Sequence, residues 1–330
     1  MKTFEDYALF DIHLHLDGAL SSDAIIKIAK EENITLPTYD PIELRKYLEV
    51  PKDCKSLNEY LEKFDLPNLV LQTKYGLKEV TNDLLERLSK QGLKYVEIRM
   101  APQLSTNKGL SQKEVVETLL EVINKSQEVY SIKANLILCL MRGADHIKNM
   151  VTVEVAKEFL GKGVVALDLA GAEALFPNNM YLEEFELARK YGIPFTIHAG
   201  EASDFHSVES ALNMGAVRIG HGIHSIQNEE TMNRLVESKI PLEICPTSNL
   251  DTKAIASLKD LKLDEFMKRG VIVTINTDDP TVSNTTLKEE YKLLKKMGLS
   301  VKDAKQIALN TINSSFLSQT EKELFKQFVK

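Results

Sequence analysis

Two histidines lie close together near the start of the chain, in the stretch DIHLHLDG at residues 11–18. His13, His15 and Asp17 alternate with leucines, and side chains two apart on a β-strand point to the same face. Burying imidazole and carboxylate groups is costly unless they are hydrogen-bonded, paired or bound to a metal ion. The spacing therefore predicts that these three side chains converge on one site.

More histidines and carboxylates stand at the ends of later apolar runs. HAGE contains His198 and Glu201, GHG contains His221, and NTDDP contains Asp278 and Asp279. For any single histidine, a hydrogen-bonded core residue is the more common explanation. Four histidines and four carboxylates at the ends of strands instead indicate a functional site, because so many buried polar groups are costly without a partner.

Three imidazoles and one carboxylate form a donor set that suits zinc. His13 and His15 come from one run and His198 from another, and catalytic zinc binds such ligands while leaving one position for water. Calcium and magnesium prefer oxygen ligands. Two-metal barrels commonly bridge their ions through a modified lysine, and VVALDLAG contains no lysine. We therefore expect one Zn²⁺ per chain.

The apolar runs alternate with stretches of helical periodicity. Eight β-rich runs can be counted: YALFDIHLHL, KYVEIRM, KANLILCL, VVALDLAG, IPFTIHAG, VRIGHGI, IPLEICPTS and VIVTINTDD. Between them lie segments such as KEVVETLLEVINKSQEVY, EEFELARKYG and NEETMNRLVESK, in which apolar residues recur at helical spacing. The alternation predicts an α/β fold, a parallel (β/α)8 TIM barrel, with its site at the carboxyl ends of the strands.

One connection is much longer than the usual short loop. About eighty residues separate the first run from the second, and SDAIIKIAKEEN, PIELRKYLE and SLNEYLEKFDL within it indicate extra helices. A long helical insertion after the first strand would lie over the mouth of the barrel. Its candidate pocket-lining residues, for which a core role is equally open, are Leu57, Tyr60, Leu61 and Phe64.

Composition favours a globular enzyme with one domain over residues 1–330, because a chain that is 43% hydrophobic can bury one large core. The net charge of −7 and the lack of a basic stretch with aromatics disfavour a nucleic-acid partner. No segment has the apolar length of a signal peptide or membrane span, so we expect no membrane association and a cytoplasmic location. The three cysteines form no CxxC pair, which favours reduced thiols. The oligomeric state is unknown from the sequence.

Taken together, the motifs resemble those of the adenosine deaminase family in the amidohydrolase superfamily. They are HLHLDGA, EIRMAPQL, TIHAGE, RIGHGIH, CPTSN and NTDDP, in this order over nearly the whole chain. The combination of HAGE, GHG and TDDP is specific to the branch that contains adenosine and adenine deaminases. The resemblance implies zinc-dependent hydrolytic deamination of adenosine and 2′-deoxyadenosine to inosine and 2′-deoxyinosine, with release of ammonia, as part of purine salvage.

The resemblance also implies roles by position. The implied zinc ligands are His13, His15, His198 and Asp278. The implied catalytic residues are Glu201, as general acid, and His221, as the base that orients water. The implied substrate contacts are His15, Asp17, Gly171 and Asp279, of which Asp17 would contact the ribose 5′-hydroxyl. Attack at C6 of the purine requires protonation of N1, which Glu201 can perform only if burial keeps its proton on.

Related activities are the alternatives. Adenine deaminases of the family usually have Glu where Asp17 stands, so HLDG favours a nucleoside substrate. AMP-type deaminases need a phosphate-binding group, and no basic residue is next to HLDG. A non-catalytic nucleoside-binding relative would not need the acid Glu201. Met100 stands where the family often has an aromatic residue, which leaves the shape of the pocket floor open.

Overall fold

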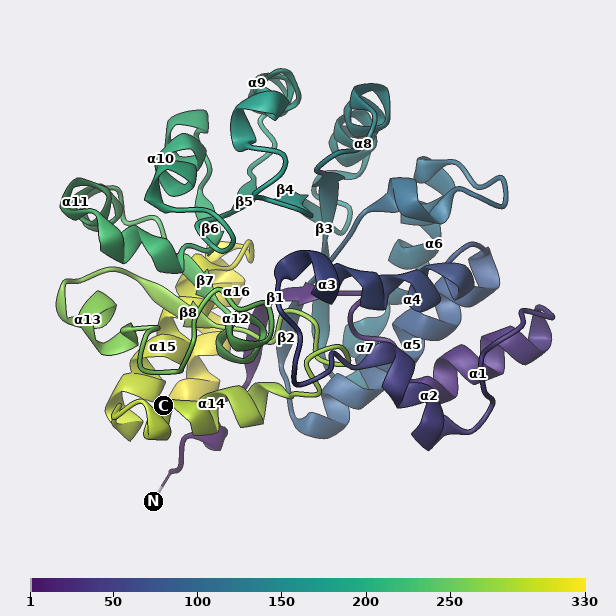
Figure 1. The fold of residues 1–330 in the computed structure, drawn as a ribbon, viewed down its shortest axis with the longest axis horizontal. Helices are drawn as coiled ribbons and strands as arrows, with labels where there is room; N and C mark the ends of the chain where they lie inside the picture. Colours follow the sequence, from purple (N-terminus) through teal and green to yellow (C-terminus); the bar gives the residue numbers. More distant parts are fainter. Residues whose placement is uncertain (1) are drawn as a thin grey trace.

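The computed structural model describes residues 2–330, and eight parallel strands form its centre (Figure 1). The strands are β1 (Phe10–His15), β2 (Tyr95–Met100), β3 (Lys133–Met141), β4 (Val164–Ala170), β5 (Thr196–Ala199), β6 (Arg218–His221), β7 (Leu242–Ile244) and β8 (Val273–Ile275). Each coincides with one of the eight predicted runs, although β3 extends one residue beyond its run, to Met141. They pair in parallel in the orders β1-β2-β3-β4 and β5-β6-β7-β8.

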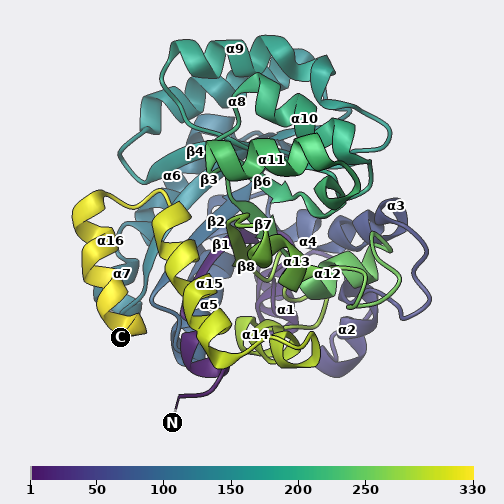
Figure 2. The same ribbon diagram turned by 90° about the vertical axis from the view of Figure 1, so that its left-hand side faces the viewer.

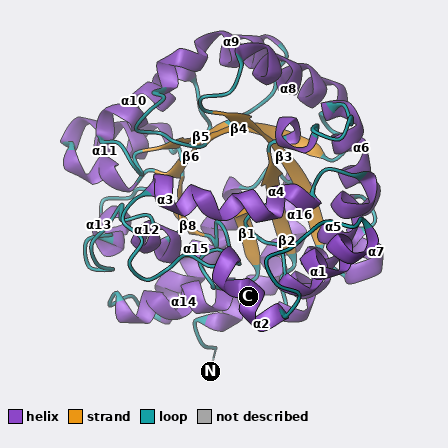
Figure 3. Ribbon diagram, turned by 45° about the vertical axis from the view of Figure 1, so that its right-hand side comes forward, coloured by secondary structure: helices purple, strands orange, loops and turns teal. Residues whose placement is uncertain are grey.

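Single β-bridges join these two sheets into a ring. Leu167 pairs with Phe195 at one seam, and Leu14 pairs with Asp278 at the other. At the second seam the His15 N–H donates to the Asp278 carbonyl at 2.8 Å, and the Asp278 N–H donates to the His13 carbonyl at 2.9 Å. Figure 3 shows the ring of strands enclosed by helices. The prediction of a (β/α)8 TIM barrel is confirmed.

Helices surround the strands on the outside (Figures 1 and 3). They are α5 (Lys74–Gln91), α6 (Gln112–Ile123), α7 (Ser126–Tyr130), α8 (His146–Phe159), α9 (Leu182–Lys190), α10 (Phe205–Met214), α11 (Glu229–Ser238), α13 (Leu263–Lys268), α14 (Leu287–Lys296), α15 (Val301–Ser314) and α16 (Gln319–Phe325). The short helix α12 (Pro246–Asp251) directly follows β7, at the carboxyl ends of the strands. Figure 2 shows α16 on the side of the barrel away from α12. No helix within residues 2–330 has the length and apolar character needed to cross a membrane.

Helix α6 illustrates how the sequence determines these elements. Ser111 and Glu114 form a reciprocal capping box at its N-terminus, which satisfies backbone donors that the first turn leaves free. Val115 and Leu119 are four residues apart, on one face, and are fully buried against the strands. Full burial of such a side chain contributes roughly 1.5–3 kcal/mol. The helical pattern that continues to residue 130 is divided in the structure: α6 ends at Ile123 with Asn124 as its C-cap, and α7 begins at Ser126.

The connection between β1 and β2 contains additional helices. They are α1 (Ser22–Glu31), α2 (Pro41–Leu48), α3 (Leu57–Leu61), the 3-10 helix η2 (Glu62–Phe64) and α4 (Asp65–Val70), and they precede α5. Figure 3 shows α3 and α4 crossing in front of the ring of strands. Tyr60 of α3 packs with Cys54 and Val282 in a small buried cluster. The insertion therefore contacts the segment that follows β8.

Candidate active site

A cavity lies at the carboxyl ends of the strands, next to α3 and η2. The sequence-predicted residues that line it are His15, Asp17, Leu57, Tyr60, Leu61, Phe64, Gly171, His198, Glu201, His221, Asp278 and Asp279. His13 is fully buried beside it. Met100 does not contribute to the lining, whereas Ala101, Cys139 and Met141 do. The structure thus brings together polar side chains from the ends of four strands and from the insertion, together with Gly171 after β4.

Four donor atoms face one another in this cavity. His13 Nε2 lies 3.1 Å from Asp278 Oδ1, and His15 Nε2 lies 3.4 Å from the same oxygen. The Nε2 atoms of His15 and His198 are 3.3 Å apart. Ligands of a tetrahedral zinc with bonds of about 2.0–2.1 Å are roughly 3.3 Å apart. Among residues 2–330, His13 Nε2 is also a buried atom without a hydrogen-bond partner, so the group fits a metal ion.

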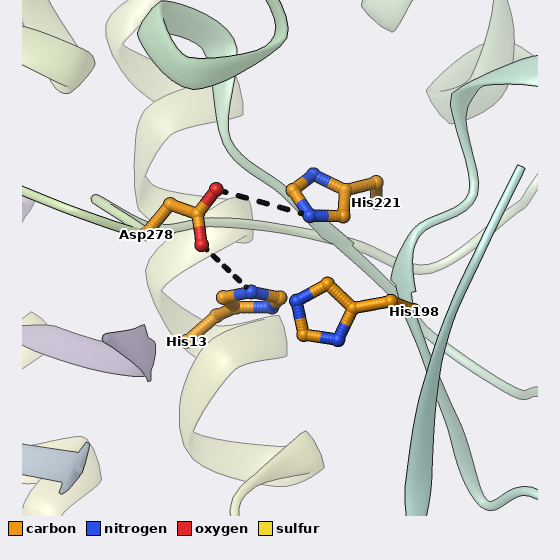
Figure 4. A group of neighbouring side chains, drawn as sticks. All are labelled: His13, His198, His221 and Asp278. Carbon is orange, nitrogen blue, oxygen red and sulfur yellow. Dashed lines mark ion pairs between the residues drawn. The ribbon is translucent and has the colours of Figure 1, made fainter. Parts of the chain in front are cut away.

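His221 approaches the same carboxylate from another direction, as Figure 4 shows. Its Nε2 is 3.8 Å from Asp278 Oδ2 and 3.5 Å from Glu201 Oε2. His221 forms one compact group with His13, His198 and Asp278. It faces Oδ2 of Asp278, however, whereas His13 and His15 face Oδ1. Burial lowers the pKa of His221 well below its usual value. A neutral imidazole between two carboxyl groups is suited to moving a proton.

Buried carboxylates behind the histidines orient the rings. His13 Nδ1 lies 2.7 Å from Glu243, and His198 Nδ1 lies 3.0 Å from Asp168. Arg99 joins the two carboxylates, with a distance of 2.9 Å to each. Burial alone would raise the pKa values of Asp168 and Glu243, but the adjacent imidazole and guanidinium groups hold both well below the usual range. Such carboxylates accept the Nδ1 proton and leave Nε2 free for a metal.

Sequence reasoning missed Arg99, Asp168 and Glu243. The available signal was the presence of charged residues inside three apolar strands: Glu97 and Arg99 in KYVEIRM, Asp168 in VVALDLAG and Glu243 in IPLEICPTS. A charge at a buried strand position needs a partner from elsewhere in the fold. That partner cannot be identified from the strand itself.

Unusual backbone conformations occur at several site residues. His221 and Asp278 have φ angles of 59° and 63°, in the left-handed region that is unfavourable for residues with a side chain. Gly171 has a φ of 104°, which favours glycine. A Cβ atom at Gly18 would lie 1.8 Å from Asp279 Oδ1, so glycine is required for this carboxylate to pack there.

The loop after β5 places Glu201 in the cavity wall. The carboxylate of Glu173 accepts hydrogen bonds of 2.6–3.1 Å from the backbone N–H groups of residues 200–203. The Thr252 hydroxyl donates to Glu201 Oε1 at 3.1 Å. Burial, together with the charge of Asp278, raises the pKa of Glu201 to about 8. The side chain is therefore mainly protonated at neutral pH.

Asp17 and Asp279 present polar atoms that the rest of the described chain does not satisfy. Each has a buried Oδ1 atom with no hydrogen-bond partner within residues 2–330. Asp279 Oδ2 accepts from the Tyr60 hydroxyl at 3.2 Å, and Tyr60 also contacts Ser283 at 2.9 Å. Burial raises the pKa of Asp17 to about 6, and burial and the charge of Asp278 raise that of Asp279 well above its usual value. Both residues line the cavity, which makes their carboxyl groups candidates for contact with a ligand.

Comparison with known proteins agrees with this arrangement. The family described as adenosine deaminase matches residues 9–330. The chain belongs to the adenosine deaminase family. Adenosine deaminase of Haemophilus ducreyi is 48% identical over 323 residues, covering 96% of this chain and 94% of that protein. Adenosine deaminase of Clostridium botulinum strain Okra is 46% identical over 330 residues, covering 99% and 98%.

The fold of this chain is also similar to that of a solved structure. The crystal structure of adenine deaminase from Arthrobacter aurescens superimposes with a TM-score of 0.89 at 28% identity, covering 97% of each chain. The barrel fold is therefore shared with an enzyme whose name gives a purine base as its substrate. The choice between base and nucleoside has to be argued from the cavity itself.

Proposed function

We propose that this chain hydrolyses adenosine and 2′-deoxyadenosine to inosine and 2′-deoxyinosine, with release of ammonia. The two relatives at 48% and 46% identity, both adenosine deaminases, support this substrate class. The observation that carries the proposal is the meeting, in one cavity, of a metal-binding group, a protonated carboxyl at Glu201 and two carboxyl oxygens without partners. Each corresponds to one requirement of the reaction.

We propose one Zn²⁺ as the metal, with His13, His15, His198 and Asp278 as its ligands. The spacing of the four donor atoms and the nitrogen-rich donor set support zinc over calcium or magnesium. When bound, zinc lowers the pKa of a water ligand toward neutrality and so supplies a nucleophile at neutral pH. Glu243 and Asp168 keep the histidine Nε2 atoms unprotonated for this role.

Glu201 supplies the proton that the purine requires. Addition of water at C6 transfers electron density to N1, and an acid next to N1 stabilises that charge by protonating it. A carboxyl group with a pKa of about 8 holds its proton until the reaction needs it. His221, 3.5 Å from Glu201 and 3.8 Å from Asp278, is positioned to orient the attacking water and to help transfer its proton to the leaving ammonia.

The other cavity residues orient the nucleoside. Asp279, with Gly171, is proposed to contact the purine, and a protonated Asp279 can donate to N7. Asp17 is proposed to accept from the ribose 5′-hydroxyl, because its free buried oxygen lacks a partner from the described chain. The apolar side chains of Leu57 and Phe64 line the same cavity and would cover the ribose. This unsatisfied acceptor favours a nucleoside over free adenine, which has no hydroxyl to offer.

The test is a comparison of substrates with purified protein. Adenosine, 2′-deoxyadenosine, adenine and AMP are supplied separately, and ammonia release and purine products are measured. We expect kcat/KM for both nucleosides to exceed that for adenine and AMP by about 10- to 100-fold or more, the scale of one charged hydrogen bond. Preference for adenine would contradict the nucleoside assignment. Metal analysis is expected to find about one zinc per chain, and two metals or none would contradict the proposed site.

A further inference from the structure

A threonine hydroxyl lies against the proposed general acid. Thr252 directly follows α12, its N–H donates to the Ser248 carbonyl at 2.8 Å, and its side chain lines the cavity. The residue is only 5% exposed. Its hydroxyl donates to Glu201 Oε1 at 3.1 Å. None of the roles proposed above uses this hydroxyl.

The hydrogen bond distinguishes the two oxygens of Glu201. A protonated carboxyl group has one O–H and one carbonyl oxygen, whereas a threonine hydroxyl can donate one hydrogen bond. Within residues 2–330, Oε1 is the acceptor that the structure provides for the Thr252 hydroxyl. If Oε1 carried the carboxyl proton, that hydroxyl would have to accept, and its own buried proton would lack a partner. The contact therefore favours protonation on Oε2.

We infer that Thr252 is a positioning residue that keeps the acidic proton of Glu201 on Oε2, the oxygen that faces His221. Oε2 is 3.5 Å from His221 Nε2. The inference rests on the proposed function. During the reaction the Oε2–H bond breaks and an N1–H bond forms on the purine, so the negative charge released remains on the Glu201 carboxylate.

The same hydrogen bond should strengthen as the proton leaves. A hydroxyl donates more strongly to a carboxylate than to a neutral carboxyl group. Thr252 therefore stabilises Glu201 more after proton transfer than before it. Interactions that are stronger in the transition state raise kcat, whereas interactions of equal strength in both states lower KM. The expected contribution of Thr252 is to turnover and not to nucleoside binding.

Two substitutions separate the hydroxyl from the shape of the side chain. Thr252→Val removes the hydroxyl and keeps the branched form, and Thr252→Ser retains the hydroxyl as a matched control. We expect Thr252→Val to keep about one zinc per chain and a KM for adenosine within about twofold, while kcat falls about 10- to 100-fold, the scale of a hydrogen bond to a charged group. Thr252→Ser should recover kcat to within a few-fold of the unsubstituted chain.

A pair of nucleoside inhibitors provides a second measurement. Purine riboside lacks the 6-amino group, and the hydrated form that mimics the reaction intermediate has a proton on N1. In 1-deazaadenosine a C–H group replaces N1, so it cannot accept a proton from Glu201. We expect Thr252→Val to weaken purine riboside by about the same factor as kcat and to leave 1-deazaadenosine affinity nearly unchanged.

Several results would overturn the inference. Unchanged kcat in Thr252→Val, equal weakening of both inhibitors, or failure of Thr252→Ser to recover activity while zinc is retained would each show that the hydroxyl does not direct the proton. If the unsubstituted chain does not deaminate adenosine, the proposed function and the inference both fail. If it does, and only the Thr252 results differ from expectation, the inference alone fails.

Discussion

At the scale of single residues, the protonation state of Glu201 determines the expected pH dependence of kcat/KM for adenosine. Burial and the nearby charge of Asp278 raise its pKa to about 8, and the protonated form is the active acid. We predict that kcat/KM for adenosine falls as the pH rises through about 8, because the proton needed at N1 is then lost. The measurement is a pH–rate profile between about pH 6 and 10.

Glu201→Gln is the variant that assigns this titration. We predict about one zinc per chain, retained binding of 1-deazaadenosine and a decrease in kcat of roughly 10²- to 10⁴-fold, since an amide cannot donate an acidic proton. The alkaline decrease near pH 8 should also disappear from the residual activity. Its persistence in Glu201→Gln would assign the titration to another group.

Asp17 allows the nucleoside assignment to be tested separately from the chemistry. Asp17→Ala should lower kcat/KM for adenosine by the equivalent of about 1.5–3 kcal/mol, the range for a hydrogen bond to a charged group. The loss should be much smaller for 5′-deoxyadenosine, which lacks the proposed partner. Equal losses on both nucleosides would instead indicate that Asp17 supports the metal-binding group.

At the scale of elements, the loop after β5 depends on Glu173. Its carboxylate accepts from the N–H groups of residues 200–203, and an amide at this position would replace one acceptor with a donor. We predict that Glu173→Gln lowers the free energy of unfolding by about 1–3 kcal/mol and lowers kcat, because Glu201 is within this loop. Urea denaturation and steady-state kinetics provide the measurements.

The control is Glu183→Gln, because the Glu183 side chain is 79% exposed on α9 and outside the cavity. It should change neither stability nor kcat. If Glu173→Gln behaved in the same way, the four backbone hydrogen bonds would not be what holds the loop in place.

The strands and their polar ends could be predicted from the sequence because both are local patterns. Alternation places His13 and His15 on one face, and each motif directly follows its own apolar run. The carboxylates behind the histidines could not be predicted in this way. Glu243 meets His13 across 230 positions of the chain, and no local pattern specifies such a pair.

Other features depended on packing. The junction between α6 and α7 was missed because a helical pattern continues through it, and the positive φ of His221 is imposed by the surrounding structure. The candidate pocket-lining residues at positions 57, 60, 61 and 64 do line the cavity. Their helical spacing fits packing in the core equally well. Only the position of the insertion relative to the barrel distinguishes packing in the core from lining the cavity. The single domain over residues 1–330 stays a prediction.

At the scale of the whole molecule, the metal-binding group joins parts of the chain that are distant in sequence. Its proposed ligands come from β1, β5 and the segment after β8. A metal that binds only the folded state adds RT ln(1 + [L]/Kd), about 4 kcal/mol at a thousandfold excess over Kd. We predict that chelation lowers the melting temperature and that added zinc restores it.

His146→Ala is the matched control for this experiment. The imidazole of His146 is half exposed at the start of α8 and contacts Glu184 at 2.9 Å, outside the cavity. Its variant should keep the zinc-dependent increase in melting temperature, and His198→Ala should lose it. A melting temperature that does not respond to zinc in the unsubstituted chain would contradict the proposed metal site.

The seam between Leu14 and Asp278 also has a consequence for synthesis of the chain, because its two sides come from segments far apart in the sequence. His13 and His15 are made first, but the carboxylate that completes their group and the backbone that closes the ring beside them both come from near the end of the chain. Bringing such distant segments together carries a loop-closure cost that short connections avoid. A nascent chain that has not yet released residue 278 from the ribosome therefore has histidines without their carboxylate partner and a ring with an open edge. Ring closure and completion of the metal-binding group therefore involve the same segment, and we expect fragments that end before β8 to lack the complete group.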